Sequence, residues 1–246
     1  CTIGLNDARQ TGGAVFLNEA NATFTNCSFY YNDSVGRGGS LYSKDSNLTI
    51  TGCLFYSSSS EGSGGALAAQ NSNLSLEGTT FTSNQSDYQG GATYLEEANA
   101  TITGCLFHTN TSETNGGALA AQNSNLSLAG ITFISNQSDY QGGATYLEEA
   151  NVTISECSFT SNAGNYSGGA ISLESASPTI SDCVFTRNVS EMNSGGALYV
   201  DANSSPTFAR NEFQYNSSLN HGGAIYLAGS QLVEVSDGLF LGNSAK

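Results

Sequence analysis

Gln89-Gly90-Gly91-Ala92-Thr93-Tyr94-Leu95 is the stretch that decides the fold, because versions of it recur along the whole chain. A Gly-Gly pair, followed by Ala or once by Ser and then by an apolar-led segment, begins at Gly12, Gly38, Gly64, Gly90, Gly116, Gly142, Gly168, Gly195 and Gly222. The spacing is 26 residues six times and then 27 residues twice. A fixed period of roughly 20–50 residues indicates a repeat architecture in which each unit contacts its neighbours.

One repeat predicts three short strands separated by corners. Gly90-Gly91 permits a positive φ, residues 92–95 form a strand, and the polar residues 96–99 form a corner. Residues 101–103 alternate polar and apolar, 104–107 form a third strand, and a polar loop leads to Gly116. We therefore predict a three-sided, right-handed, single-stranded parallel β-helix of about nine 26–27-residue rungs. A rung is one complete turn and lies ~4.8 Å from the next.

Two residue columns at repeat spacing support this fold. Phe recurs in every unit, at Phe29, Phe55, Phe81, Phe107, Phe133, Phe159, Phe185, Phe213 and Phe240, which predicts a stacked core. Three residues later comes Asn, with Ser58 as the exception. We predict a ladder of stacked amides from Asn32, Asn84, Asn110, Asn136, Asn162, Asn188, Asn216 and Asn243.

Composition narrows the possible functions. The 246 residues carry 6 Lys and Arg against 21 Asp and Glu, a net charge of −15. Because phosphates need basic side chains, we expect no nucleic-acid partner. No apolar run approaches the ~18 residues of a membrane helix, so we predict no membrane span in this segment. The chain starts at Cys1, already in phase with the repeat, so we expect residues 1–246 to be a single domain from a longer or processed chain.

The cysteines also share a column, two residues before the column Phe. Cys1, Cys27 and Cys53 fall on consecutive rungs, as do Cys157 and Cys183, while Cys105 is isolated. Their shared parity with Phe predicts buried thiols that behave as small hydrophobic groups. Disulfides between rungs are the alternative, since the expected Cα spacing is within reach although parallel Cβ vectors fit poorly. Spacing typical of a zinc site is absent from the sequence.

Sequons for N-glycosylation are frequent, and the exposed corners carry most of the candidates. We predict that glycans, if any, are attached at Asn21, Asn26, Asn47, Asn73, Asn99, Asn125, Asn151, Asn165 and Asn203. Sequons within the predicted amide ladder would be inaccessible. The alternative is that copying of a corner Asn produced sequons that carry no sugar.

An aromatic column is a candidate binding surface. Tyr42, Tyr94, Tyr146, Tyr199 and Tyr226 share one strand position. If the other parity of the strand faces the core, these rings stand outside as a stripe for sugar or protein. Stacking on the face of the solenoid is the alternative. Rows of Thr-x-Thr suggest an ice-binding face as a further alternative, but Glu77 and Ala129 interrupt these rows.

The motifs themselves resemble a known family. The repeat pairs Gly-Gly-Ala and an aliphatic residue with Phe-x-x-Asn, as in GGALYV, GGAIYL, FTSN, FHTN, FISN, FTRN and FQYN. This pattern resembles the repeats of the chlamydial polymorphic outer-membrane proteins and covers essentially the whole chain. The resemblance implies a surface-exposed β-helix that acts in adhesion.

We therefore predict a non-enzymatic extracellular protein that serves as an adhesive or structural rod. The expected partners are copies of this chain stacked head to tail into a filament, or a host or neighbouring surface protein or glycan. Apart from N-linked glycans, no cofactor is expected. A polysaccharide lyase or hydrolase is the alternative, but the Asp, Glu and His residues form no catalytic constellation in the sequence.

Overall fold

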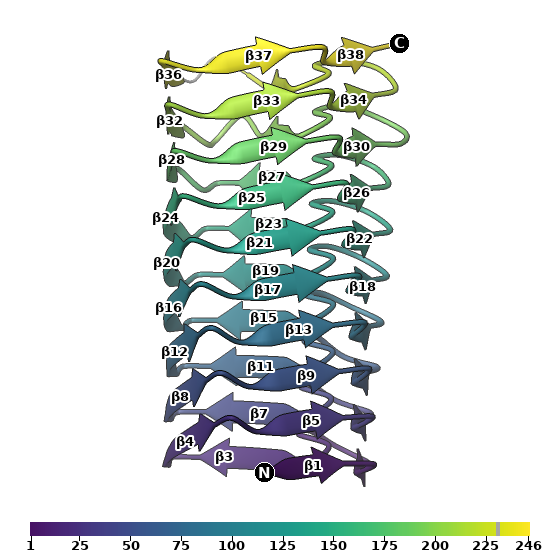
Figure 1. The fold of residues 1–246 in the computed structure, drawn as a ribbon, viewed down its shortest axis with the longest axis vertical. Helices are drawn as coiled ribbons and strands as arrows, with labels where there is room; N and C mark the ends of the chain where they lie inside the picture. Colours follow the sequence, from purple (N-terminus) through teal and green to yellow (C-terminus); the bar gives the residue numbers. More distant parts are fainter. Residues whose placement is uncertain (230–231) are drawn as a thin grey trace.

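The protein is a rod of stacked rungs built from short parallel strands. The computed structural model describes residues 1–229 and 232–246, and in these ranges every named element is a β-strand. Each strand pairs in parallel with the equivalent strand one repeat away, so the strands form four sheets along the rod. Figure 1 shows two broad sheets, one in front of the other, joined by further sheets at both edges, which are seen edge-on.

The two broad sheets are sheet A and sheet C. Sheet A contains β1 (Thr2–Gly4), β5 (Ser28–Tyr30), β9 (Leu54–Tyr56), β13 (Thr80–Thr82), β17 (Leu106–His108), β21 (Thr132–Ile134), β25 (Ser158–Thr160), β29 (Val184–Thr186), β33 (Glu212–Gln214) and β37 (Leu239–Leu241). Sheet C contains β3 (Val15–Asn18), β7 (Leu41–Lys44), β11 (Leu67–Gln70), β15 (Thr93–Glu96), β19 (Leu119–Gln122), β23 (Thr145–Glu148), β27 (Ile171–Glu174), β31 (Leu198–Val200) and β35 (Ile225–Leu227).

Sheets D and B close the two edges of the rod. Sheet D contains β4 (Asn21–Thr25), β8 (Asn47–Thr51), β12 (Asn73–Glu77), β16 (Asn99–Thr103), β20 (Asn125–Ala129), β24 (Asn151–Ser155), β28 (Thr179–Ser181), β32 (Thr207–Ala209) and β36 (Glu234–Ser236). Sheet B contains the two-residue strands β2 (Asp7–Ala8), β6 (Asp33–Ser34), β10 (Ser59–Ser60), β14 (Gln85–Ser86), β18 (Thr111–Ser112), β22 (Gln137–Ser138), β26 (Ala163–Gly164), β30 (Val189–Ser190), β34 (Ser217–Ser218) and β38 (Ser244–Ala245).

The three sides predicted from the sequence correspond to sheets A, C and D. Sheet B lies in the segment that we expected to be a polar loop, because two polar residues per repeat carry no periodic signal for a strand. The loop is nevertheless drawn into register by the rungs on either side: Gln85 pairs with Ser59 and with Thr111. Each rung therefore has four strands, the fourth of them only two residues long.

The Gly-Gly pair lies where the chain returns from sheet B to sheet C, and both positions exclude a side chain. Gly90 has a φ of +68°, which an L side chain rarely adopts. A Cβ on Gly91 would overlap the carbonyl oxygens of Thr111 and of Gly117 on the next rung. Backbone from two rungs meets here, and this close approach explains why the pair recurs in every repeat.

The predicted Phe column forms the centre of the core. The rings from Phe29 to Phe213 are fully buried, and consecutive rings stack with centroids 4.5–5.0 Å apart. Phe240, in the final rung, is 47% exposed. On sheet C, Thr93 and Thr145 share one inward-facing position with Leu41, Leu67 and Leu119. Both Thr side chains are fully buried, and their hydroxyls have no hydrogen-bond partner.

Candidate ligand-binding face

Sheet D presents a mainly polar surface to solvent, with exposed carboxylates at Glu77 and Glu234. Along β8, β12 and β16 the side chains alternate between exposed and buried, so each strand directs its first Asn and the Thr or Ser two residues later outward. The Leu, Ala and Ile between them face the core. Because the strands pair in register, identical positions lie side by side on successive rungs.

The exposed Asn residues form an outer amide ladder, defined as Asn21, Asn47, Asn73, Asn99, Asn125 and Asn151. Each Nδ2 donates to the Oδ1 of the preceding rung at 2.7, 2.8, 3.2, 3.1 and 3.4 Å in chain order. An amide group has two N–H donors and two acceptor lone pairs. A ladder residue therefore keeps one donor and one acceptor for another molecule.

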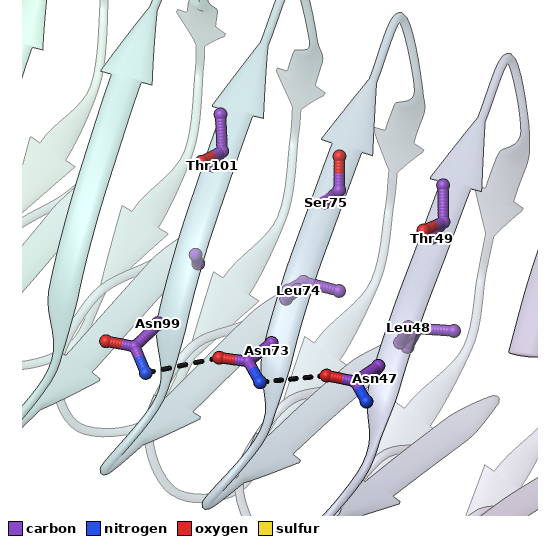
Figure 2. A pocket seen from close by; sticks show the side chains of 9 residues that line it. Asn47, Leu48, Thr49, Asn73, Leu74, Ser75, Asn99 and Thr101 are labelled. Atoms are coloured by element: carbon purple, nitrogen blue, oxygen red, sulfur yellow. Dashed lines mark hydrogen bonds between the residues drawn. The ribbon is translucent and has the colours of Figure 1, made fainter. Parts of the chain in front are cut away.

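A shallow groove of about 380 Å³ lies on this face. It is lined by Asn47, Leu48, Thr49, Asn73, Leu74, Ser75, Asn99, Ala100 and Thr101. Figure 2 shows the Asn side chains as one hydrogen-bonded row and Thr49, Ser75 and Thr101 as a second, parallel row. The lining contains no ionisable side chain, so its chemistry suits a neutral ligand rich in hydroxyl groups.

The remaining glycosylation candidates lie near corners. Asn26 is exposed with a φ of +52°, Asn203 is exposed, and Asn165 is half-buried. The other six candidates are the exposed Asn residues of the outer amide ladder, so eight of the nine candidates are exposed. Their modification stays a prediction.

A second set of Asn residues forms an inner amide ladder at the corner between sheets A and B. The residues are Asn32, Asn84, Asn110, Asn136, Asn162, Asn188, Asn216 and Asn243. Asn136 is typical: its Nδ2 donates to Phe107 O and Asn162 Oδ1, each at 3.0 Å, and its Oδ1 accepts from the backbone and side chain of Asn110. Ser58 breaks the row, and its backbone N–H donates to Asn84 Oδ1. These buried amides hold successive rungs together.

The cysteine column lines the corner between sheets D and A. All six thiols are free in this structure; Cys1 is exposed, whereas Cys27, Cys53, Cys105, Cys157 and Cys183 are buried. The Sγ of Cys53 accepts the backbone N–H of Cys27 at 3.3 Å, and Cys183 does the same for Cys157 at 3.4 Å. Burial raises the pKa of Cys105 to about 11. The thiols therefore cap backbone donors, and their redox state in the cell stays a prediction.

The aromatic column does not form the exposed stripe that we predicted. Tyr42, Tyr94 and Tyr146 are 7, 3 and 3% exposed, while Tyr199 and Tyr226 are half-buried. Tyr42, Tyr94 and Tyr146 form a separate buried cluster with Ala68 and Ala120 on the outward side of sheet C. Covered ring faces cannot stack on a ligand, so these three rings cannot bind one in this way, whereas a binding role for Tyr199 and Tyr226 stays a prediction.

The carboxylates beside these rings have partners within the chain. Tyr146 donates to Glu174 Oε2 at 2.7 Å, Gln122 donates to Glu148, and Arg37 pairs with Glu96. In the two described ranges, no three His, Cys, Asp or Glu side chains are grouped so that they could hold a metal ion. No helix among the described residues could cross a membrane.

Sequence reasoning missed a second group of exposed aromatic residues. Tyr88, Tyr140 and Tyr166 lie in the loops between sheets B and C and are 57, 46 and 41% exposed. Tyr88 and Tyr140 are 52 residues apart, so the repeat itself could have flagged them.

Comparison with known proteins places the fold in a family. The model for the right-handed β-helix region matches residues 1–137, 41–213 and 135–246, which together span the chain. The chain belongs to the right-handed β-helix family. Membership confirms the predicted parallel β-helix and its handedness.

Other comparisons add little about this β-helix. It matches no curated protein sequence. A solved structure, the A-module of mannuronan C-5 epimerase AlgE6 from Azotobacter vinelandii, is similar at 12% identity with a TM-score of 0.28, over 97% of this chain and 80% of that one.

Proposed function

We propose that this β-helix is a non-enzymatic extracellular rod that adheres to uncharged glycans of a neighbouring surface through the outer face of sheet D. The observation that carries the proposal is the outer amide ladder with its parallel row of Thr and Ser hydroxyls. Sugar hydroxyls both donate and accept hydrogen bonds, as do amides and hydroxyls. The chemistry of the groove and of a neutral glycan is therefore complementary.

Repetition compensates for the weakness of each contact. A hydrogen bond exchanged with water contributes only about 0.5–1.5 kcal/mol, so one sugar on one rung would bind poorly. Asn and hydroxyl positions recur on successive rungs ~4.8 Å apart, and a glycan chain lying along the rod would contact several at once. Linked contacts of this kind raise the overall affinity well above that of one site.

The framework keeps these positions at fixed spacing. Strand pairing in four sheets and the inner amide ladder connect each rung to the next, so little ordering is needed on binding. The resemblance to surface adhesin repeats supports the same role and an extracellular location. Assembly of rods head to tail stays a prediction.

Specific residues argue against the two alternatives, an enzyme and an ice-binding protein. Glu96, Glu148 and Glu174 are bonded to Arg37, Gln122 and Tyr146, an arrangement that uses carboxylates to hold the structure. In the row two residues beyond Thr49, Ser75 and Thr101, Glu77 replaces Thr, which interrupts the flat hydroxyl array expected for ice binding.

A glycan array with unglycosylated protein tests the proposal. We expect binding to extended neutral glycans, and we expect Ser75→Arg, which fills the groove, to abolish it. Thr80→Arg is the matched control, because it adds the same side chain in the same repeat but on sheet A. Binding that survives Ser75→Arg, or a folded protein that binds no neutral glycan, would contradict the proposal.

A further inference from the structure

A second exposed surface lies on the loops beyond sheet B, along one edge of the rod in Figure 1. Tyr88, Tyr140 and Tyr166 occupy equivalent positions there: Thr114 N donates to Tyr88 O, Tyr140 N to Thr114 O, and Tyr166 N to Tyr140 O. The Tyr140 and Tyr166 rings stack with centroids 4.9 Å apart, although both are more than 40% exposed. A row of exposed aromatic rings is typical of interaction surfaces.

Carboxylates form a row one residue earlier in these loops, directly before Tyr88 and Tyr140, while Asn165 precedes Tyr166. Glu61, Asp87, Glu113 and Asp139 lie on four consecutive rungs, and Glu191 lies two rungs further on. Backbone bonds such as Glu113 N to Ser86 O hold them in register. All five side chains are exposed. We call the two rows together the tyrosine–carboxylate ridge.

Acids also face one another on adjacent rungs elsewhere, at Glu148 and Glu174 on sheet C and at Asp7 and Asp33 on sheet B, but only in pairs. Over most of sheet C the sequence alternates amide and acid, at Gln70, Glu96, Gln122 and Glu148. On the ridge nothing separates the four consecutive acids, and like charges on adjacent strands repel. The ion pairs among the described residues, Arg37 with Glu96 and Arg210 with Asp182, lie elsewhere.

A hollow of about 190 Å³ runs along the foot of the ridge. It is lined by Gln85, Thr111, Ser112, Glu113, Gln137 and Asp139. The two carboxylates on its rim are therefore accompanied by amide and hydroxyl groups that could bind a polar side chain lying between them.

We propose that the tyrosine–carboxylate ridge docks an Arg- and Lys-rich segment of another protein. A guanidinium group stacks on aromatic rings and pairs with carboxylates, and it would relieve the repulsion along the acid row. The chain contains this arrangement internally: Arg37 pairs with Glu96 while its Cζ lies 5.1 Å from the centre of the Tyr94 ring. The net charge of −15 favours the same class of partner.

Binding of nona-arginine, measured by fluorescence anisotropy at physiological salt, tests the proposal. We expect Glu113→Gln with Asp139→Asn to weaken binding about tenfold, because two charge-assisted contacts are lost. We expect Tyr140→Ala with Tyr166→Ala to weaken it several-fold and to reduce the preference for nona-arginine over nona-lysine. All four residues are exposed, so the variants should fold, and thermal unfolding checks this.

The matched control is Glu97→Gln with Glu149→Gln, which removes the same number of charges from exposed positions at the corner between sheets C and D. A loss of binding confined to the ridge variants supports the proposal. Equal losses in both charge variants would mean that net charge alone attracts the peptide, and would overturn it, as would failure to bind at physiological salt. Ser75→Arg should leave peptide binding unchanged, which separates this surface from the groove on sheet D.

Discussion

Arg37 reaches across the rung that contains Ala68 to pair with Glu96, and its guanidinium lies over the ring of Tyr94 on the same strand as Glu96. The contact joins a loop to sheet C two rungs away, and the small Ala68 between Tyr42 and Tyr94 is fully buried. Side-chain packing on the outside of this sheet therefore adds a connection between rungs that strand pairing does not supply.

Replacing Arg37 by Ala should destabilise the rod by about 1–2 kcal/mol, because an ion pair and a cation–π contact at a partly buried site are lost together. Chemical denaturation measures the change. Arg210→Ala removes the more exposed pair with Asp182 and should have a smaller effect. Equal losses of stability in the two variants would show that the partial burial of Arg37 does not strengthen its ion pair.

Asn136→Ala should be among the most damaging single substitutions in the chain. It removes the acceptor for Asn110 and the donor to Phe107 O inside a fully buried corner. At about 1–3 kcal/mol for each buried group left unpaired, we expect a loss of roughly 3–5 kcal/mol. Asn99→Ala in the outer ladder, measured in the same denaturation series, should cost much less because water replaces the lost partner. Comparable losses at the two sites would contradict this account.

Thr93→Val should stabilise the protein by about 1 kcal/mol. The Thr93 hydroxyl is buried without a hydrogen-bond partner, and Val has nearly the same shape without the polar atom. Urea midpoints for this variant and for the exposed Thr101→Val give the comparison. A destabilised Thr93→Val protein would indicate that the hydroxyl has a partner.

The buried tyrosines should make the protein sensitive to alkali. Burial, and for Tyr146 the bond to Glu174, raise the pKa of Tyr94 and Tyr146 above the ordinary value of 10.0. The unfolded chain therefore loses these protons first, and the stability present below pH 10.0 falls as the pH rises above it. The Tyr146→Phe variant lacks one of these groups, so its stability should fall less steeply with pH. The slopes of the two proteins should differ by about 1.4 kcal/mol for each pH unit. Parallel profiles for the two proteins between pH 9 and 12 would refute the assignment.

Thiol reactivity should distinguish Cys1 from the rest. Only the exposed Cys1 should react quickly with a thiol reagent at neutral pH, because the other five are buried and burial raises the pKa of Cys53 and Cys105. In denaturant all six should react. Fewer than six reactive thiols in denatured protein from its native source would favour the disulfide alternative.

The sequence could predict which residues stack on one another, because these residues occupy equivalent positions in successive repeats. A fixed period puts equivalent residues of successive rungs next to one another, so the Phe stack and the inner amide ladder follow from spacing and parity alone. The alternation of Thr49, Ile50 and Thr51 likewise predicts which side chains of sheet D face outward. Two-residue strands and loop paths leave no such signal.

By itself, the sequence determined the repeat, the parallel pairing and the register, because in a solenoid each residue has its neighbours one period away. Only the tertiary structure decided which polar and aromatic columns meet solvent. Tyr94 packs with Ala68 and Ala120 beneath the guanidinium of Arg37, which comes from a loop of an earlier rung, whereas Tyr140 stays exposed in its own loop. Parity within a strand indicates which side a residue faces, but what lies over that side depends on where the loops pack.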